Sequence, residues 1–290
     1  MKFSSKFANA ESVEKFNRLL STISKLCKEC EMRICKDKFQ LAKKEAAVDN
    51  GQKLICEFSL ASFFIDFRMD GWNAANDEIY LTFSPDQVFN ALRNLSLAKS
   101  VKMRLTKKSI PYLTFEIKLP SLAANDRLVT HDIPVVVSPP RLWNPSAFDD
   151  FPIQPEVTLL LPPLKVVQKV IAGMKHMGQC VVVTGNKAGE MTLTMQTDEV
   201  SVNAFFPSST SIPFDSSTAT HNNSNATTSV SARSQSSSAR VELKSLMTFL
   251  SIHLSLHARA LVGISDGRLI HLCIVCEDYR LQHLIPAVSF

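Results

Sequence analysis

The chain contains 290 residues, of which 45% are hydrophobic and 20% charged, and its formal net charge is +5. This composition is that of a folded globular protein, and the length suits two domains of about 140 residues that each bury a core. No apolar run reaches the ~18–20 residues of a membrane-spanning helix, which excludes a helical membrane protein, and no apolar run follows Lys2, so we expect no signal peptide.

Charge and cysteine content narrow the class only slightly. Residues 1–138 contain 21 Lys and Arg against 16 Asp and Glu, whereas residues 139–290 contain 11 of each, so the positive excess lies in the first half. A mild excess of this kind is compatible with nucleic-acid binding but does not indicate it alone. The seven cysteines, an odd number, predict reduced thiols inside a cell.

The first half is predicted to contain two helices among short strands. The helix Glu11–Cys27 carries apolar residues on one face and charged residues on the other. A second helix begins at Ser84 as N-cap, with Pro85 at the first helical position and Gln87 completing a capping box. The predicted strands are Lys2–Ala8, Met32–Cys35, Phe39–Ala42, Leu54–Phe58, Ile79–Phe83, Val101–Thr106, Tyr112–Leu119 and Leu128–Val137.

A proline-rich segment follows the last of these strands. Pro134 interrupts that strand, and because proline cannot donate to a ladder, the strand is expected at a sheet edge. Further prolines at positions 139, 140, 145, 152 and 155 predict an extended connector without regular structure. We therefore divide the chain into domains 1–138 and 157–290, joined by a connector at 139–156.

The second half repeats the order of the first. Its first helix begins at Pro162-Pro163 and runs to Met177, and its polar face carries lysines but no acidic residue. Ser, Thr and Asn dominate residues 207–239, a composition that predicts a disordered loop. The remaining predicted elements are the helix Leu243–Leu250 and the strands Val157–Leu161, Cys180–Thr184, Met191–Gln196, Val200–Phe206, Ala260–Ile264, Leu269–Val275 and Arg280–Leu284.

The doubled order predicts the fold class. Each half contains a strand, a helix, several strands, a helix and three strands, which is a repeat of topology rather than of sequence. We expect an α+β protein in which the two helices of each half pack side by side on one face of an antiparallel sheet.

The sequence holds no recognised catalytic motif. It has no glycine-rich dinucleotide motif, no P-loop and no nucleophile elbow. The pair His131-Asp132 is compatible with a metal-dependent phosphohydrolase, but neighbours in a strand point to opposite faces, so a structural role is the preferred interpretation. We expect no enzyme activity, no cofactor and no bound metal.

Other pairs of metal-binding residue types were weighed against ordinary structural roles. Cys27 with Cys30 and Cys273 with Cys276 have a zinc-like spacing, yet buried free thiols are the preferred interpretation. His253 and His257 have the spacing of helical metal ligands but lack the glutamate of the metalloprotease motif. Ser234-Gln235 matches the minimal site of DNA-damage checkpoint kinases, although chance explains it in a serine-rich segment.

Several blocks, in order along the whole chain, give it a resemblance to a known family. The blocks are Met1-Lys-Phe, Asn76-Asp-Glu-Ile-Tyr-Leu81, Lys107-Lys-Ser-Ile-Pro-Tyr-Leu-Thr114, Val129-Thr-His-Asp-Ile-Pro134, Pro139 with Leu142-Trp143, and Leu281-Gln-His-Leu-Ile-Pro-Ala287. In these blocks the chain resembles the Hus-type subunits of the checkpoint sliding clamp, the Rad nine–Rad one–Hus one ring, which are PCNA-like DNA clamps. Only the Ser/Asn-rich segment is longer than expected for that family.

The resemblance implies a DNA-clamp fold of two similar βαβββαβββ domains, with antiparallel sheets outside and helices lining the hole of a six-domain ring. It implies a nuclear, non-enzymatic subunit that assembles with two Rad-type subunits and has no membrane partner. A clamp loader would place the ring on double-stranded DNA without sequence preference, and the ring would recruit repair and signalling proteins in the DNA-damage response. The alternative within the class is a homotrimeric replication clamp.

The same resemblance assigns three sets of residues. The DNA-facing set is Lys15, Arg18, Lys25, Lys28, Arg93, Lys99, Lys165, Lys169, Lys175, His176 and Lys244. The subunit-interface set, on strands taken as sheet edges, is Tyr112, Leu113, Thr114, Phe115, Glu116, Ile117, Val200, Val202, Ala204 and Phe206. The partner-docking and connector set is Pro140, Leu142, Trp143, Ile285 and Pro286, with Trp143 and Leu142 expected to anchor the connector rather than to bind a partner.

Overall fold

The computed structural model describes residues 1–44, 51–73, 76–93, 95, 97–121, 126–149, 154–207, 236–252 and 258–288. The chain divides into two compact units: unit 1 comprises 1–47, 54–149 and 277–281, and unit 2 comprises 48–53, 150–276 and 282–290. The predicted connector therefore contributes its first part, up to residue 149, to unit 1. The pair His253 and His257, Ser234, and most of the Ser/Asn-rich segment lie outside the described residues.

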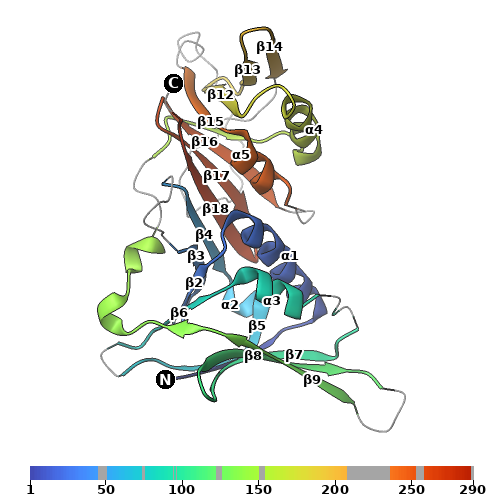
Figure 1. The fold of residues 1–290 in the computed structure, drawn as a ribbon, viewed down its shortest axis with the longest axis vertical. Coiled ribbons are helices and arrows are strands. Elements are labelled where there is room, and N and C mark those ends of the chain that lie inside the picture. The colour runs from blue at the N-terminus through green and yellow to red at the C-terminus, as the bar shows by residue number, and fades with distance from the viewer. Residues whose placement is uncertain are drawn as a thin grey trace. The chain divides into compact units, whose positions relative to one another are not determined.

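The described part of unit 1 contains strands of two antiparallel sheets and three α-helices (Figure 1). One sheet has the strand order β5-β1-β7-β8-β9, and the other includes the order β10-β6-β2-β3-β4. The elements are β1 Lys2–Phe7, α1 Ala10–Leu26, β2 Cys30–Ile34, β3 Phe39–Lys43, β4 Lys53–Phe58, α2 Leu60–Phe63, β5 Phe64–Asp70, β6 Ile79–Phe83, α3 Pro85–Ala91, β7 Ser100–Lys107, β8 Pro111–Leu119, β9 Arg127–Pro134 and β10 Val136–Val137, followed by the 3-10 turns η1 Pro140–Leu142 and η2 Pro145–Ala147.

The helix α1 forms where its amphipathic pattern and its cap agree. Asn9 is the N-cap, and its side-chain oxygen accepts a hydrogen bond from the backbone N–H of Ser12 at 2.8 Å. The apolar face buries Phe16, whose ring packs on those of Phe7 and Phe58 at centroid distances of 5.3 Å each. This phenylalanine core holds α1 on β1 and β4, and leaves the charged face of the helix in solvent.

Two features of unit 1 differ from the sequence prediction. The strand β5 and the short helix α2 were not predicted, because the segment bends: the β1–β5 register shifts between Ser4 and Lys6, and Asp66 has φ 53. A bulge of this kind breaks the alternation on which a strand prediction depends. The capping box at α3 is also wrong, since Ser84 makes no side-chain cap hydrogen bond; Pro85 lies in the first turn as predicted and has no N–H to cap.

Pro134 ends β9 at the edge of the first sheet, as predicted. Among the described strands β9 pairs only with β8, through the register Tyr112↔Pro134. After the proline the chain joins the other sheet, where Val136 of β10 lies opposite Thr82 of β6. The proline therefore marks the point at which one predicted strand becomes two.

Unit 2 has the same kind of architecture. One sheet has the order β14-β13-β12-β15, and a second includes β18-β17-β16-β11. The elements are β11 Val157–Leu160, α4 Leu164–Met174, β12 Cys180–Asn186, β13 Met191–Gln196, β14 Ser201–Phe206, β15 Ser236–Glu242, α5 Leu243–Leu250, β16 Arg259–Ser265, β17 Leu269–Val275 and β18 Tyr279–Pro286. The helices α1 and α3 of unit 1, and α4 and α5 of unit 2, pack side by side, which confirms that prediction.

The strand β15 corrects the predicted extent of the disordered loop. Residues 236–239 pair with β12, for example Ala239 with Val183, and Ser237 is buried. Serine and alanine have a low intrinsic preference for strands, so pairing with β12 rather than composition places these residues in a strand. The helix α4 ends at Met174 rather than Met177, because Gly173 weakens its last turn.

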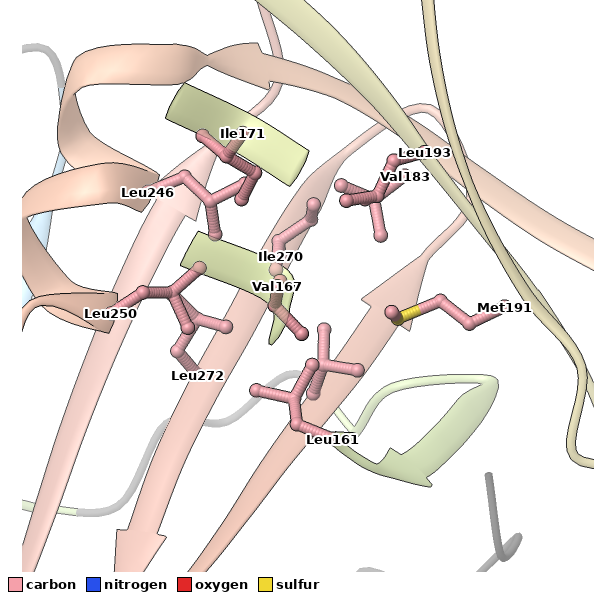
Figure 2. A pocket seen from close by; sticks show the side chains of 11 residues that line it. Leu161, Val167, Ile171, Val183, Met191, Leu193, Leu246, Leu250, Ile270 and Leu272 are labelled. Carbon is pink, nitrogen blue, oxygen red and sulfur yellow. The ribbon is translucent and has the colours of Figure 1, made fainter. Parts of the chain in front are cut away.

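Figure 2 shows side chains of α4 and α5 meeting side chains of the strands of unit 2. Val167 and Ile171 of α4 and Leu246 and Leu250 of α5 point into an apolar core lined also by Leu161, Val183, Met191, Leu193, Val262, Ile270 and Leu272. The remaining cavity is about 10 Å³, and its lining is entirely apolar. Because the apolar faces of both helices are used in this core, their lysines lie on the opposite, solvent-facing side.

Candidate nucleic-acid interface and sheet edges

The outer face of α4 is positively charged and carries no acidic residue. Lys165, Lys169 and Lys175 are exposed, and none of them forms an ion pair with another described residue. His176 is exposed beside them. Cations that are held by no carboxylate can exchange their counterions for the phosphates of a nucleic acid, which makes this face the strongest candidate interface.

A groove extends this face toward α5. It has a volume of about 520 Å³ and is lined by Lys175 at the end of α4 and by exposed Lys244 in the first turn of α5, together with Gly178, Gln179, Glu242, Leu243, Met247 and Thr248. The carboxylate of Glu242 accepts a hydrogen bond from Ser245 Oγ at 2.8 Å. The structure thus brings together two lysines that are far apart in sequence.

The outer face of α1 differs because acids neutralise part of it. The Lys15 ammonium contacts Asp278 at 2.6 Å and Glu11 at 2.9 Å, and the hydrogen bond to Asp278 is the main reason why the pKa of Lys15 is raised. Arg18 pairs with Glu14 on the same face. This half of the helix therefore offers little net charge to an approaching phosphate.

The structure accordingly divides the predicted DNA-facing set in two. Three members are engaged in ion pairs, the third being Lys99 with Asp126 at 2.5 Å. The members that are exposed and form no ion pair within the described part of the chain are Lys25, Lys28, Arg93, Lys165, Lys169, Lys175 and Lys244, with His176 exposed as well.

Both units have open sheet edges among the described strands, but one of the two predicted edge strands is not at an edge. Residues Tyr112, Leu113, Thr114, Phe115, Glu116 and Ile117 were assigned to an edge strand, and this is wrong: they lie on β8, which pairs with β7 on one side and β9 on the other. Their backbone groups are used inside the sheet. The edges of this sheet are β9, which lies next to β8, and β5; in unit 2 the edges of the corresponding sheet are β14, as predicted, and β15.

Exposed apolar side chains stand on both edges. Leu128 of β9 is 59% exposed, and Phe205 of β14 is 58% exposed. Sequence reasoning named Val202, Ala204 and Phe206 on β14, which are half-buried, and missed Phe205 between them. Alternation along a strand gives two faces but does not say which one the rest of the fold covers.

The strap 138–149 is fixed to unit 1 by an aromatic contact. The ring of Trp143 stacks on that of Tyr80 at 4.7 Å, and Trp143 Nε1 donates a hydrogen bond to the Ser138 carbonyl at 2.8 Å. Phe148 packs edge-on against the same tyrosine at 5.6 Å. Leu142 is 68% exposed, so it is the member of the predicted docking set that is available to a partner.

Replacing Trp143 by alanine is expected to lower the free energy of unfolding by about 2 kcal/mol, because the stacked ring and its hydrogen bond are both removed. Limited proteolysis of the strap and urea denaturation measure the effect. The matched variant Leu142→Ala removes an exposed side chain and should change little. Equal effects of both substitutions would contradict the anchoring role.

A partly buried ion pair between Arg33 and Glu78 lies next to the Tyr80 ring. Arg33 donates to Glu78 through Nη2 at 2.8 Å and Nε at 3.0 Å, and its guanidinium carbon lies 5.8 Å from the Tyr80 ring centroid. The bond from Arg33 lowers the pKa of Glu78 below its ordinary value of 4.5. Its stabilisation is therefore present at neutral pH and disappears as the pH falls through the lowered value.

We expect Glu78→Gln to cost about 2 kcal/mol at neutral pH, the typical worth of hydrogen bonds to a charged partner. The difference from the native chain should shrink in acid, where the native carboxyl is also protonated. Urea titrations at neutral and acidic pH measure both points. Glu29→Gln, which alters an exposed pair with Lys44, serves as control; a difference that grows in acid would refute this explanation.

The end of the chain corrects another assignment. Ile285 is 1% exposed on β18 and Pro286 is half-buried. Because its side chain is buried within the fold, Ile285 cannot be part of a docking surface. The predicted strand Arg280–Leu284 extends through Ile285 to Pro286.

Comparison with known proteins decides the family. A family model for Hus1-like proteins matches residues 1–289. The chain belongs to the Hus1-like family. It is 32% identical over 289 residues to human "Checkpoint protein HUS1", which covers 100% of both chains, and 22% identical to Drosophila melanogaster "Checkpoint protein Hus1-like", which covers 99% of each.

Solved structures agree on the fold of this Hus1-like chain. Proliferating cellular nuclear antigen from Entamoeba histolytica matches with a TM-score of 0.69 at 12% identity, and PCNA of A. fulgidus with a bound FEN-1 segment matches at 0.63 and 13%; each covers 99% of both chains. The chain therefore has the PCNA clamp fold. The expected βαβββαβββ pattern has three strands between its two helices, and the described chain has more. Unit 2 has four described strands between α4 and α5, β12 to β15, and unit 1 has five between α1 and α3, β2 to β6.

The residues weighed for other chemistry have ordinary roles in the Hus1-like chain. Asp132 accepts a hydrogen bond from Thr114 Oγ1 at 2.6 Å and pairs with Lys108, and these contacts lower its pKa. Neither the described part around His131 nor any other described part groups three or more His, Cys, Asp or Glu side chains in a way that could hold a metal. The Hus1-like family and the clamp fold do not favour the phosphohydrolase alternative.

The cysteines considered as metal ligands lie in buried or half-buried positions of the Hus1-like chain. Cys27, Cys30 and Cys273 are buried and Cys276 is half-buried. Burial raises the pKa of Cys30 well above its ordinary value, which makes this thiol a poor nucleophile and a poor metal ligand. Among the described helices, none is long and apolar enough to cross a membrane.

Proposed function

We propose that this protein is the Hus-type subunit of a heterotrimeric, DNA-encircling checkpoint clamp that acts in DNA-damage signalling and repair. It has no catalytic role of its own. It assembles with two Rad-type subunits, is loaded in the nucleus onto double-stranded DNA by a clamp loader, and serves as a platform for repair and signalling proteins. Family membership over the whole chain supports the checkpoint role.

The observation that carries this proposal is an acid-free, exposed lysine face on α4 in a chain with the clamp fold. In a ring whose helices line the hole, this face meets the phosphates of the enclosed duplex. Contacts to phosphates carry no sequence information, which suits a clamp that must slide. The neutralised half of α1 leaves unit 2 as the stronger contributor.

Assembly is proposed to use the open edges of β9 and β14. An edge strand presents unpaired N–H and C=O groups, and pairing them with a strand of a neighbouring subunit satisfies them. The edges β9 and β14 would each hold one neighbour. A ring of three subunits results if each neighbour has the same two edges.

Light scattering of the chain alone and mixed with two Rad-type subunits tests the proposal. We expect a monomer alone and a complex of one copy of each chain in the mixture. A stable homotrimer of the chain alone would favour a replication-type clamp instead. A mixture that yields no complex would refute the proposal.

A further inference from the structure

The outward face of the sheet β5-β1-β7-β8-β9 carries a second group of unneutralised cations. In this sheet Phe3, Phe7, Met103 and Phe115 point inward and are buried, and the helices of unit 1 lie on that side (Figure 1). Alternation then turns Lys6, Lys102 and Lys118 to the opposite side. With Arg68 on β5 these residues form what we call the outer patch: Lys6, Arg68, Lys102 and Lys118.

Register places the members of the outer patch next to one another. Lys6 of β1 lies directly opposite Lys102 of β7, and Lys102 lies opposite Glu116, two residues from Lys118. Arg68 lies opposite Ser4, two residues from Lys6. Like charges directly opposite on neighbouring strands repel, so the pair Lys6 and Lys102 is unfavourable unless an anion lies between them.

The acids on this face are already engaged elsewhere or lie at its margin. Glu116 pairs with Arg104, and Asp132 pairs with Lys108. Asp70 lies opposite Lys2 at the end of β1. Within the described part of the chain, the four side chains of the outer patch form no ion pair, and Arg68, Lys102 and Lys118 are exposed. Part of the positive excess of the first half of the sequence thus lies on the sheet face that points away from the helices.

We propose that the outer patch is a docking surface for an extended acidic segment of a partner protein. Neighbouring strands lie about 4.8 Å apart and alternate side chains of an extended chain about 6.6 Å apart, so carboxylates along an extended peptide can reach successive cations of the patch. A single nucleic-acid strand fits less well, because the only aromatic residue that register turns outward on the described strands of this face, Tyr112, is half-buried and gives bases no platform. This surface is distinct from the helix face proposed for DNA and does not depend on ring assembly.

Fluorescence anisotropy with a labelled oligoglutamate peptide of about twelve residues tests the proposal on the full chain. The variant Lys6→Glu with Lys102→Glu should weaken binding about tenfold or more at low salt, since two attractions become two repulsions. The control variant Lys38→Glu with Arg141→Glu changes the net charge equally at exposed sites away from this sheet and should stay within about twofold of the native chain.

The outcomes separate a site from general attraction. Equal losses of peptide affinity in the charge-reversed variant and the control variant, or no loss in the charge-reversed variant, would overturn the proposal. In a competition experiment, displacement of the labelled peptide by an unlabelled single-stranded oligonucleotide at a lower concentration than by the unlabelled peptide would also overturn it. The neutral variant Lys6→Gln with Lys102→Gln, expected to bind about threefold more weakly, keeps the test decisive if the reversed variant folds poorly. Its thermal unfolding temperature should be at least as high as that of the native chain, because a repulsive pair is removed.

Discussion

Replacing Lys165 and Lys169 by glutamate is expected to weaken binding of the chain to duplex DNA on the order of a hundredfold at about 50 mM salt. Both side chains are exposed on α4, form no ion pair with a described residue, and have no acid on their own helix. Because each lysine would neutralise one phosphate, the double variant should also reduce the slope of log affinity against log salt by about 2, at any DNA sequence. Anisotropy titrations over a range of salt concentrations measure both quantities.

The variant Lys6→Glu with Lys102→Glu is the matched control for this experiment. It makes the same change in net charge on the outward sheet face of unit 1 and should leave the salt slope near its native value. Circular dichroism should show both variants folded, because all four side chains lie outside the core. If both variants reduce DNA binding equally, the α4 face is merely solvated and the DNA assignment fails.

Substituting aspartate for Phe205 or for Leu128 is expected to break one subunit contact each. Either substitution places a charge on an edge strand whose exposed apolar side chain would be buried in the proposed assembly. Such anchors are typically worth about 2 kcal/mol or more, about thirtyfold in affinity. Since β14 and β9 face different neighbours in the proposed ring, each variant should retain a different Rad-type partner. Pull-down with each partner separately, followed by light scattering, shows which one remains.

Leu97→Asp provides the control for the edge substitutions. Leu97 is 76% exposed, so it is as accessible as the edge residues, and it belongs to no strand edge. We expect it to assemble like the native chain. Retention of the same partner by both edge variants, or full assembly by either, would contradict the assignment of β9 and β14 to separate interfaces.

Helices and the doubled topology could be predicted from the sequence because their signal is local. The 3.6-residue spacing of apolar residues in α1 and α4 indicates which face of each helix is buried. Pro134 predicts a sheet edge by itself, because it has no N–H to donate to a neighbouring strand. Strand order is not local. Nothing in Tyr112–Leu119 indicates that β9 will pair with it, so the sheet edge was predicted one strand too far inward. The bulged β5 and the serine-rich β15 were missed for a similar reason, since their partners rather than their composition hold them.

The candidate site also has a part that local sequence predicts and a part that depends on contacts distant in sequence. The free lysines of α4 could be found from the sequence, because the acids that would neutralise them are missing from the helix itself. Lys15 looked equivalent, but its partner Asp278 lies 263 positions away. The outer patch escaped notice entirely, since Lys6, Lys102 and Lys118 meet only through strand register. Contacts distant in sequence therefore decide which charges a surface presents.

Retention on circular DNA tests the proposed clamp most directly. The chain is assembled with two Rad-type subunits, loaded by the clamp loader onto a nicked circular plasmid, and separated from unbound protein by gel filtration before and after a single cut linearises the DNA. We expect the protein to stay with the circle and to leave the linear form, because a ring held by topology slides off free ends. Equal retention on both forms, or none on the circle, would contradict a DNA-encircling subunit.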